Sequence, residues 1–244
     1  MEYTIKPLLL GKFKGSKGQM TYFVDYEKEI WIPMVAWYIK GGDKHVLVDT
    51  GLSSPAIQRY LFGRPYEEIA SFEEALNALG LTPGDIDIVI QTHLHYDHCG
   101  NTTKCTRAKV IVQEEEIKFA YSAHALFAGS YNLEYLKDLR FRVVAGDREI
   151  LDGIRVLHLP GHSPGTQAVA VDTKQGTVAI SGFCCVKDNM YPPEKMRVKW
   201  PVIAPGVSVN SLQAFDSALR LKSSADIVIP QHAIEFAEMA EIPS

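Results

Sequence analysis

The chain has 244 residues, of which 46% are hydrophobic and 22% are charged, and its formal net charge is −4. This balance excludes intrinsic disorder and predicts one folded domain over residues 1–244. A slightly acidic chain without a Lys/Arg-rich stripe argues against a nucleic-acid partner, and the absence of a long apolar run argues against membrane insertion. The first residues lack a signal-peptide pattern, and the four cysteines do not form a disulfide framework, so we expect a cytoplasmic location.

Short apolar and β-branched runs predict strands in the first half of the chain, at residues 5–10, 35–39, 45–49, 86–91 and 109–113. The glycines at positions 41 and 42 predict the hairpin turn that joins the second of these strands to the third. A capping-box pattern from Ser71 to Glu74 begins a helix that is expected to end near Gly80. A second helix is expected over residues 114–127, with acidic residues at its start.

The second half repeats this arrangement. Strands are expected at residues 143–145, 149–151, 154–158, 167–172, 177–181 and 227–230, and a helix at residues 209–221. Each half is therefore a group of strands followed by helix–strand units. This order predicts an α+β fold in which two mixed β-sheets pack face to face with helices on the outer faces, an αββα sandwich.

One short segment is much richer in potential metal ligands than the rest of the chain. Four such residues lie within six positions: His93, His95, Asp97 and His98. Imidazole nitrogens and carboxylate oxygens bind Zn²⁺ and similar transition metals, and the i, i+2 spacing directs His93 and His95 to the same side of an extended turn. A chance surface cluster is the alternative, but this density of ligands favours a metal site.

Two further histidines follow predicted strands. His162 lies in a loop whose glycines and prolines fix a tight turn, and His232 follows the strand predicted at residues 227–230. Taken alone, each could be a turn histidine that faces water. Beside the histidine-rich segment, both are candidate ligands.

The order and spacing of these six residues resemble those of the metallo-β-lactamase superfamily, and Val46–Gly51 looks like its early strand and Asp-Thr-Gly turn. Within the superfamily the chain is most similar to the N-acyl homoserine lactonase branch. That similarity rests on the stretches Val110–Gln113, Ala145–Ile150 and Leu159–Gln167.

The resemblance implies a hydrolase that uses a metal-activated water to open a lactone or a related small cyclic ester or amide. It implies one or two divalent ions, with Zn expected and Mn or Fe as alternatives. One ion would be held by His93, His95 and His162, and a second by Asp97, His98 and His232. Asp97 would also relay a proton to the leaving group. Asp49 would hold the histidine segment in position, or it is a plain turn residue.

The chain departs from the family in one respect. The family has an aspartate that bridges the two metals, but no acid lies between Asp172 and Asp188. Depending on the register, Gly182, Phe183 or Cys184 occupies that position. Only Cys184 can bind a metal, as a thiolate. The segment from Gly182 to Lys187 also resembles the Gly-Gly-Cys-x-x-Lys segment of β-lactamases that use a cysteine ligand.

Three interpretations of Cys184 follow: it completes the second metal site, or the second metal is weak or absent, or the cysteine is a small apolar residue of the core. In the first case Lys187 is available for a substrate carboxylate. The lactonase branch also carries a tyrosine shortly after the bridging aspartate. The nearest tyrosine in this chain is Tyr191, which is a second candidate substrate-binding residue.

We therefore expect a small-molecule substrate, and the sequence leaves a homodimer open. A thioester or β-lactam-type hydrolase is the alternative enzyme, and a degenerate, metal-poor protein that binds a ligand without turnover is the alternative outside catalysis. Large apolar side chains are candidates for the walls of the substrate pocket, namely Trp31, Met34, Trp37, Phe119, Phe127, Tyr131, Met190, Tyr191 and Trp200. Most of them are expected to pack in the core or against loops instead.

Overall fold

The computed structural model describes residues 2–52 and 56–243. Within these residues the larger sheet has seven strands in the order β4-β1-β2-β3-β5-β6-β7. Its strands are β1 (Thr4–Ser16), β2 (Glu29–Lys40), β3 (Val46–Val48), β4 (Tyr66–Glu68), β5 (Ile88–Ile90), β6 (Lys109–Gln113) and β7 (Arg140–Val144). The strands β4, β1, β2 and β3 pair antiparallel, whereas β3, β5, β6 and β7 pair parallel, so the sheet is mixed.

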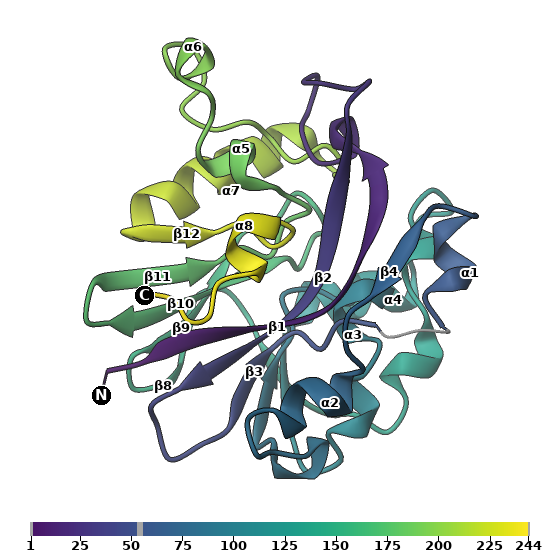
Figure 1. Cartoon of the computed structure of the whole chain (residues 1–244), viewed down its shortest axis with the longest axis vertical. Helices are drawn as coiled ribbons and strands as arrows, with labels where there is room; N and C mark the ends of the chain where they lie inside the picture. Colours follow the sequence, from purple (N-terminus) through teal and green to yellow (C-terminus); the bar gives the residue numbers. More distant parts are fainter. Residues whose placement is uncertain (1, 53–55, 244) are drawn as a thin grey trace.

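The smaller sheet has five strands in the order β12-β11-β10-β9-β8. They are β8 (Arg148–Leu151), β9 (Ile154–His158), β10 (Gln167–Thr173), β11 (Gly176–Ile180) and β12 (Ile227–Ile229). Pairing is antiparallel except between β11 and β12, which run parallel. Figure 1 shows the two sheets facing each other, with the chain termini near the same end of the sandwich.

Alternation along the strands produces the layers. In β2, Val35, Trp37 and Ile39 face the other sheet and belong to the cluster that fills the space between the sheets, whereas Ala36 and Tyr38 face outward. Strands of both sheets contribute to that inner cluster. Because successive side chains of a strand point to opposite faces, this strand is apolar on both sides and buried on both.

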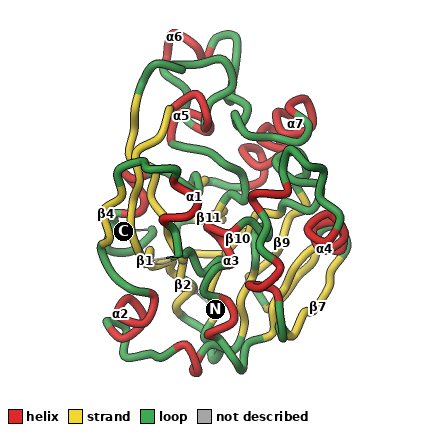
Figure 2. The backbone as a smooth tube through the Cα atoms, turned by 90° about the vertical axis from the view of Figure 1, so that its right-hand side faces the viewer, coloured by secondary structure: helices red, strands yellow, loops and turns green. Residues whose placement is uncertain are grey.

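Helices cover the outer faces, and Figure 2 shows them at the periphery of the strands. On the larger sheet, α2 (Phe72–Asn77) packs Phe72 and Leu76 against the outward residues of β1, β2 and β3, and α4 (Glu114–Tyr121) lies against β6. On the smaller sheet, α7 (Ser211–Ser224) packs Ala218 and Leu221 against β10, β11 and β12. The predicted αββα arrangement is therefore confirmed.

The remaining helices are single turns, namely α1 (Gln58–Leu61), α3 (Tyr96–Cys99), α5 (Lys187–Met190), α6 (Glu194–Arg197) and α8 (Ile234–Ala237). Within the part of the chain that the structure describes, no helix combines the length and apolar character needed to cross a bilayer.

Several predicted boundaries are wrong. The first two strands are much longer than predicted, because they pair with each other along almost their whole length and place polar residues in the ladder as well. The helix predicted to reach Phe127 ends at Tyr121. There, Ser122 donates to the carbonyl of Lys118 and His124 accepts from the amide of Leu126, and such local side-chain bonds compete with helix continuation.

Candidate metal centre

The candidate ligands meet at one edge of the sandwich, where strands of both sheets end. The strand β5 leads directly into the segment that holds His93 and His95, and α3 carries Asp97 and His98. His162 comes from the loop between β9 and β10, and His232 follows β12. The fold thus brings together residues that are far apart in the sequence.

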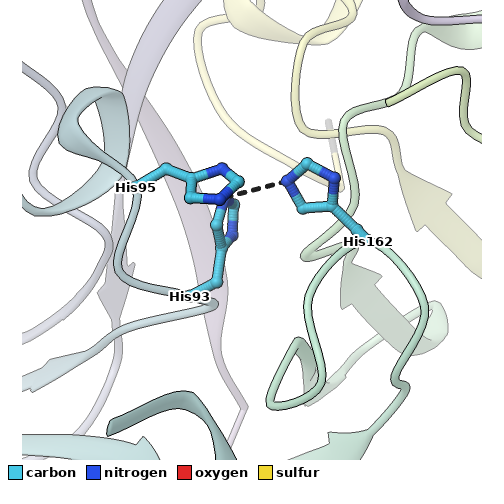
Figure 3. A group of neighbouring side chains, drawn as sticks. All are labelled: His93, His95 and His162. Carbon is cyan, nitrogen blue, oxygen red and sulfur yellow. Dashed lines mark hydrogen bonds between the residues drawn. The ribbon is translucent and has the colours of Figure 1, made fainter. Parts of the chain in front are cut away.

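The first group consists of three buried histidines, His93, His95 and His162, whose ligand atoms lie within 4.8 Å of one another. Figure 3 shows the three rings converging, two from the histidine segment and one from the opposite loop. The Nε2 atoms of His93 and His162 are 3.2 Å apart. Two nitrogens bound to one tetrahedral Zn²⁺ at 2.0–2.1 Å would be separated by roughly 3.3 Å, so this group fits a zinc-sized ion.

The second group consists of Asp97, His98 and His232, with the same limit of 4.8 Å between ligand atoms. The Asp97 Oδ2 atom lies 3.5 Å from Nε2 of His98 and 3.9 Å from Nε2 of His232. Both histidines are buried, whereas Asp97 is partly exposed to the pocket. A carboxylate and two imidazoles are suitable ligands for a divalent transition metal.

Hydrogen bonds to the far side of the rings orient three of these histidines. The Nδ1 atom of His162 lies 2.6 Å from the carbonyl oxygen of Val207, and that of His232 lies 3.0 Å from the carbonyl oxygen of Pro33. A carbonyl can only accept, so Nδ1 carries the proton in both rings. Their Nε2 atoms therefore present a free lone pair to the centre, as a metal ligand must.

Asp49 performs the same role for His98, whose Nδ1 lies 2.7 Å from Asp49 Oδ2. The Asp49 carboxylate also accepts from the amide and hydroxyl of Thr92, at 2.8 and 2.7 Å, and from Nε2 of Gln231 at 3.0 Å. Asp49 is fully buried and has a φ of 54°, a backbone conformation that non-glycine residues rarely adopt. These contacts tie three segments of the centre together and differ from those of a plain turn residue.

Burial sets the protonation of the first group. It lowers the pKa of His93 and His95 well below the usual value, and it lowers the pKa of His162 to about 4. For His98, burial also opposes the charged form, but the neighbouring Asp97 and Asp49 outweigh it and raise the pKa. The first group is thus three neutral imidazoles, which is the form that binds metal.

Sequence reasoning missed Glu116, a fully buried carboxylate at the start of α4. It accepts from the amide of Leu94 at 2.9 Å, from the hydroxyl of Tyr131 at 3.1 Å, and from the hydroxyl of Ser163. Leu94 lies between two candidate ligands and Ser163 follows a third, so Glu116 links the two loops of the first group. In the sequence Glu116 is the last of three consecutive glutamates, and no pattern distinguishes it from the exposed Glu114 and Glu115.

Two glycines permit this close packing. A Cβ atom on Gly165 would lie 2.1 Å from the backbone nitrogen of Glu116. Gly161 has a φ of +136°, and a Cβ there would lie 2.3 Å from the backbone nitrogen of Ala214 in α7. The loop that carries His162 is therefore clamped between α4 and α7, and glycine is required at both contacts.

Cys184 is the residue of its segment that faces the centre. Phe183 is fully buried in the cluster between the smaller sheet and α7, and Gly182 packs against the carbonyl of Gln167. Cys184 lines the same pocket as Asp97 and His232, but its Sγ atom lies 3.2 Å from Sδ of Met20 and belongs to neither ligand group. Burial, with Asp97 nearby, raises the pKa of this thiol well above its usual value.

The two candidate substrate-binding residues lie elsewhere. Lys187 lines a neighbouring cavity that shares His232 with the central pocket. The hydroxyl of Tyr191 donates to the carbonyl of Val228 and accepts from its amide, both at 2.9 Å, so it is committed to the backbone of β12. Neither residue is among the described residues that line the central pocket.

The central pocket has a volume of about 260 Å³, and both polar and apolar side chains line it. Besides the candidate ligands and Cys184, large side chains form its wall, namely Phe13, Met20, Ile32, Tyr60, Phe62, Tyr96 and Val207. None of the nine predicted wall residues is among the described residues that line it. Tyr131 contacts the candidate ligand His95, with ring centroids 4.7 Å apart. Most of the other large side chains fill the core or lie on other surfaces, as expected.

The comparison with known families agrees with this geometry. The model of the metallo-β-lactamase superfamily matches residues 31–232, which is most of the chain. The chain belongs to the metallo-β-lactamase superfamily. All six candidate ligands lie within the matched range.

Curated relatives of this superfamily member are lactonases. The chain is 26% identical over 222 residues to the N-acyl homoserine lactonase AiiA of Bacillus thuringiensis subsp. kurstaki, covering 84% of this chain and 82% of that protein. It is 28% identical over 188 residues to the N-acyl homoserine lactonase AiiB of Agrobacterium fabrum, covering 67% of each. The resemblance to the lactonase branch is therefore confirmed.

Solved structures share the fold. A quorum-quenching N-acyl homoserine lactone lactonase superposes with a TM-score of 0.78 at 24% identity, over 98% of this chain and 95% of that one. An N-acyl homoserine lactone hydrolase with its product, N-hexanoyl-L-homoserine, bound at the catalytic metal centre superposes with a TM-score of 0.77 at 23% identity, over 96% and 95%. The relatives thus belong to the enzyme class that the sequence predicted for this chain, the metal-dependent hydrolases that open a lactone.

Proposed function

We propose that this chain hydrolyses the lactone ring of an N-acyl homoserine lactone or a close analogue. The observation that carries the proposal is the group formed by His93, His95 and His162, which are buried and neutral and have converging nitrogens at the spacing of zinc ligands. The pocket beside them, whose wall includes large apolar side chains, suits an acyl chain. The lactonase relatives support the same choice of substrate class.

In this proposal His93, His95 and His162 hold one ion, and Asp97, His98 and His232 hold a second. We propose zinc, because imidazole and carboxylate are among its preferred ligands, with manganese and iron as competitors. A divalent ion bound there lowers the pKa of a water molecule and polarises a carbonyl group.

The second ion would be held more weakly than the first. No carboxylate is present in the segment from Ser181 to Lys187, where the family has its bridging aspartate. We propose that Cys184 remains a thiol packed on Met20 and does not replace that ligand, because its Sγ atom lies 3.2 Å from Sδ of Met20 and outside both groups. A thiol must lose its proton before it binds zinc.

Asp97 is the proposed proton carrier. It is the one carboxylate among the described residues that line the pocket, and its Oδ2 atom lies beside both His98 and His232. Asp97 would accept a proton from the attacking water and pass it to the ring oxygen as the ester C–O bond breaks. One water is consumed, and the products are a carboxylate and an alcohol in one molecule, with the second proton released to solvent.

The test is hydrolysis by protein that has been stripped with a chelator and then reloaded. Stripped protein should not open N-hexanoyl-homoserine lactone, and reloading with Zn²⁺, Mn²⁺ or Fe²⁺ should restore turnover, measured by acid release. A thioester and a β-lactam of similar size serve as comparison substrates for the alternative hydrolase. If fully loaded protein opens no lactone, the proposal fails, and a protein that retains no ion would point to the metal-poor alternative.

A further inference from the structure

The central pocket contains a basic residue that the chemistry above does not use. Arg64 lies between α1 and β4, and its backbone amide donates to the carbonyl of Leu61 at 3.0 Å. Its side chain is partly buried and lines the same pocket as Asp97 and the histidines. Among the described residues of this lining it is the only lysine or arginine.

The Arg64 guanidinium has no carboxylate partner in the described ranges, 2–52 and 56–243. Its recorded side-chain bond is to Oε1 of Gln19, at 3.3 Å. Other arginines differ: Arg155 makes two bonds of 2.7 Å to Asp172, and Arg220 is paired with Asp147. A guanidinium has five N–H donors, so Arg64 can offer more than the one bonded to Gln19 to a bound molecule.

The surroundings strengthen the attraction of this charge for an anion. The lining of the same pocket includes the aromatic rings of Tyr60 and Tyr96, which stack with centroids 3.7 Å apart, and the apolar side chains of Phe13 and Ile32. Tyr96 precedes Asp97 in α3, so the charge and the proposed proton carrier share one wall. A partly buried charge in a pocket interacts more strongly with an anion than a charge in open water does.

We propose that Arg64, supported by Gln19, is a specificity-determining residue that binds an anionic group on the substrate, remote from the lactone ring. The inference rests on the proposed function and narrows it to lactones whose side chain carries a carboxylate. A planar guanidinium matches a carboxylate with two parallel hydrogen bonds, and lysine cannot reproduce this geometry. In this proposal Gln19 accepts from one end of the guanidinium, at 3.3 Å, and the ligand takes other N–H donors of the group.

The experiment uses two lactones of equal chain length, N-hexanoyl-homoserine lactone and its analogue with a terminal carboxylate, N-adipoyl-homoserine lactone. With the metal-loaded enzyme, kcat/KM for the carboxylate lactone should be at least about tenfold higher than for N-hexanoyl-homoserine lactone. This ratio corresponds to about 1.4 kcal/mol of free energy, and the difference should lie mainly in KM. The Arg64→Met variant should lose this preference, and Arg64→Lys should retain part of it. Raising the salt concentration should also reduce the preference, because screening weakens the attraction.

Arg59→Met is the matched control, because Arg59 is an exposed arginine of α1 that does not line the pocket, and it should keep the wild-type preference. Equal kcat/KM values for the two lactones in the wild type, or an unchanged preference in Arg64→Met, would overturn the inference while leaving the lactonase proposal intact. If neither lactone is opened, the lactonase proposal fails by itself. Calorimetric binding of adipate to metal-free wild-type and Arg64→Met protein then decides whether Arg64 recognises the anion.

Discussion

The two groups of candidate ligands lie side by side, but the first is more buried and more firmly held in position than the second. His93, His95 and His162 are all buried, neutral imidazoles, and the loop of the third is clamped between two helices. The group of Asp97, His98 and His232 has one partly exposed member and lacks the family's bridging acid. Ligands that are already held in position lose less conformational freedom when an ion binds, so we expect the first group to bind tightly and the second weakly.

The largest expected effect comes from the first group. His162→Ala should remove the tight ion and lower kcat/KM on the lactone roughly a thousandfold, because a bound metal supplies several kcal/mol of transition-state stabilisation. Metal content by mass spectrometry, measured with activity, checks this. The exposed His124 provides the control, and His124→Ala should change neither quantity. Full metal content in His162→Ala would contradict the assignment of the first group.

A smaller effect is expected from the residue that supports the second group. Asp49→Asn should weaken metal binding by roughly 10–100-fold, the range found for groups that orient a metal ligand. The amide would direct hydrogens toward Thr92 and Gln231, which donate to the present carboxylate. Competition with a chromogenic chelator measures the affinity. The exposed turn residue Asp43 is the control, and if Asp43→Asn weakened binding equally, the effect would not belong to the Asp49 contacts.

Substitutions at Cys184 test the difference between the groups directly. Cys184→Ala should leave metal stoichiometry unchanged, because the thiol packs on Met20 and lies outside both groups. Cys184→Asp should tighten the weaker ion by about tenfold, or 1.4 kcal/mol, by returning a carboxylate to the pocket. Titration calorimetry of metal-free protein measures both. If Cys184→Ala bound one ion fewer than the wild type, Cys184 would be a metal ligand and the prediction would be wrong.

The smallest effect is expected away from both groups. Arg155 lowers the pKa of Asp172 through their hydrogen bonds, and the pair is partly exposed. Because the folded-state pKa is lowered, the stabilisation is present above the usual aspartate value and is lost as the pH falls through the folded-state pKa. Arg155→Ala should lower the free energy of unfolding by less than about 1 kcal/mol at neutral pH. Urea unfolding measures the free energy of unfolding of the wild type and of Arg155→Ala at neutral and acidic pH. The difference between the two proteins should be smaller at acidic pH, and an equal difference at both pH values would contradict this prediction.

The sequence predicted the fold well because its strands are short apolar runs bounded by clear turn residues. It failed where neighbours decide the outcome. The lengths of β1 and β2 follow from their mutual pairing, and the end of α4 follows from local bonds of Ser122 and His124. The residues of the pocket wall could not be selected from the sequence, because a large apolar side chain has the same sequence signature in a core as in a pocket.

The sequence by itself determined the chemistry: which side chains can hold metal ions, their grouping in the chain, the missing acid and the family. Only the tertiary structure decided which side chain of the segment after β11 faces the pocket, and that Glu116 and Asp49 join the loops. It also placed Lys187 and Tyr191 outside the lining of the central pocket and Arg64 within that lining. The physical reason is that ligand identity is a local property, whereas orientation and burial arise from contacts between distant segments.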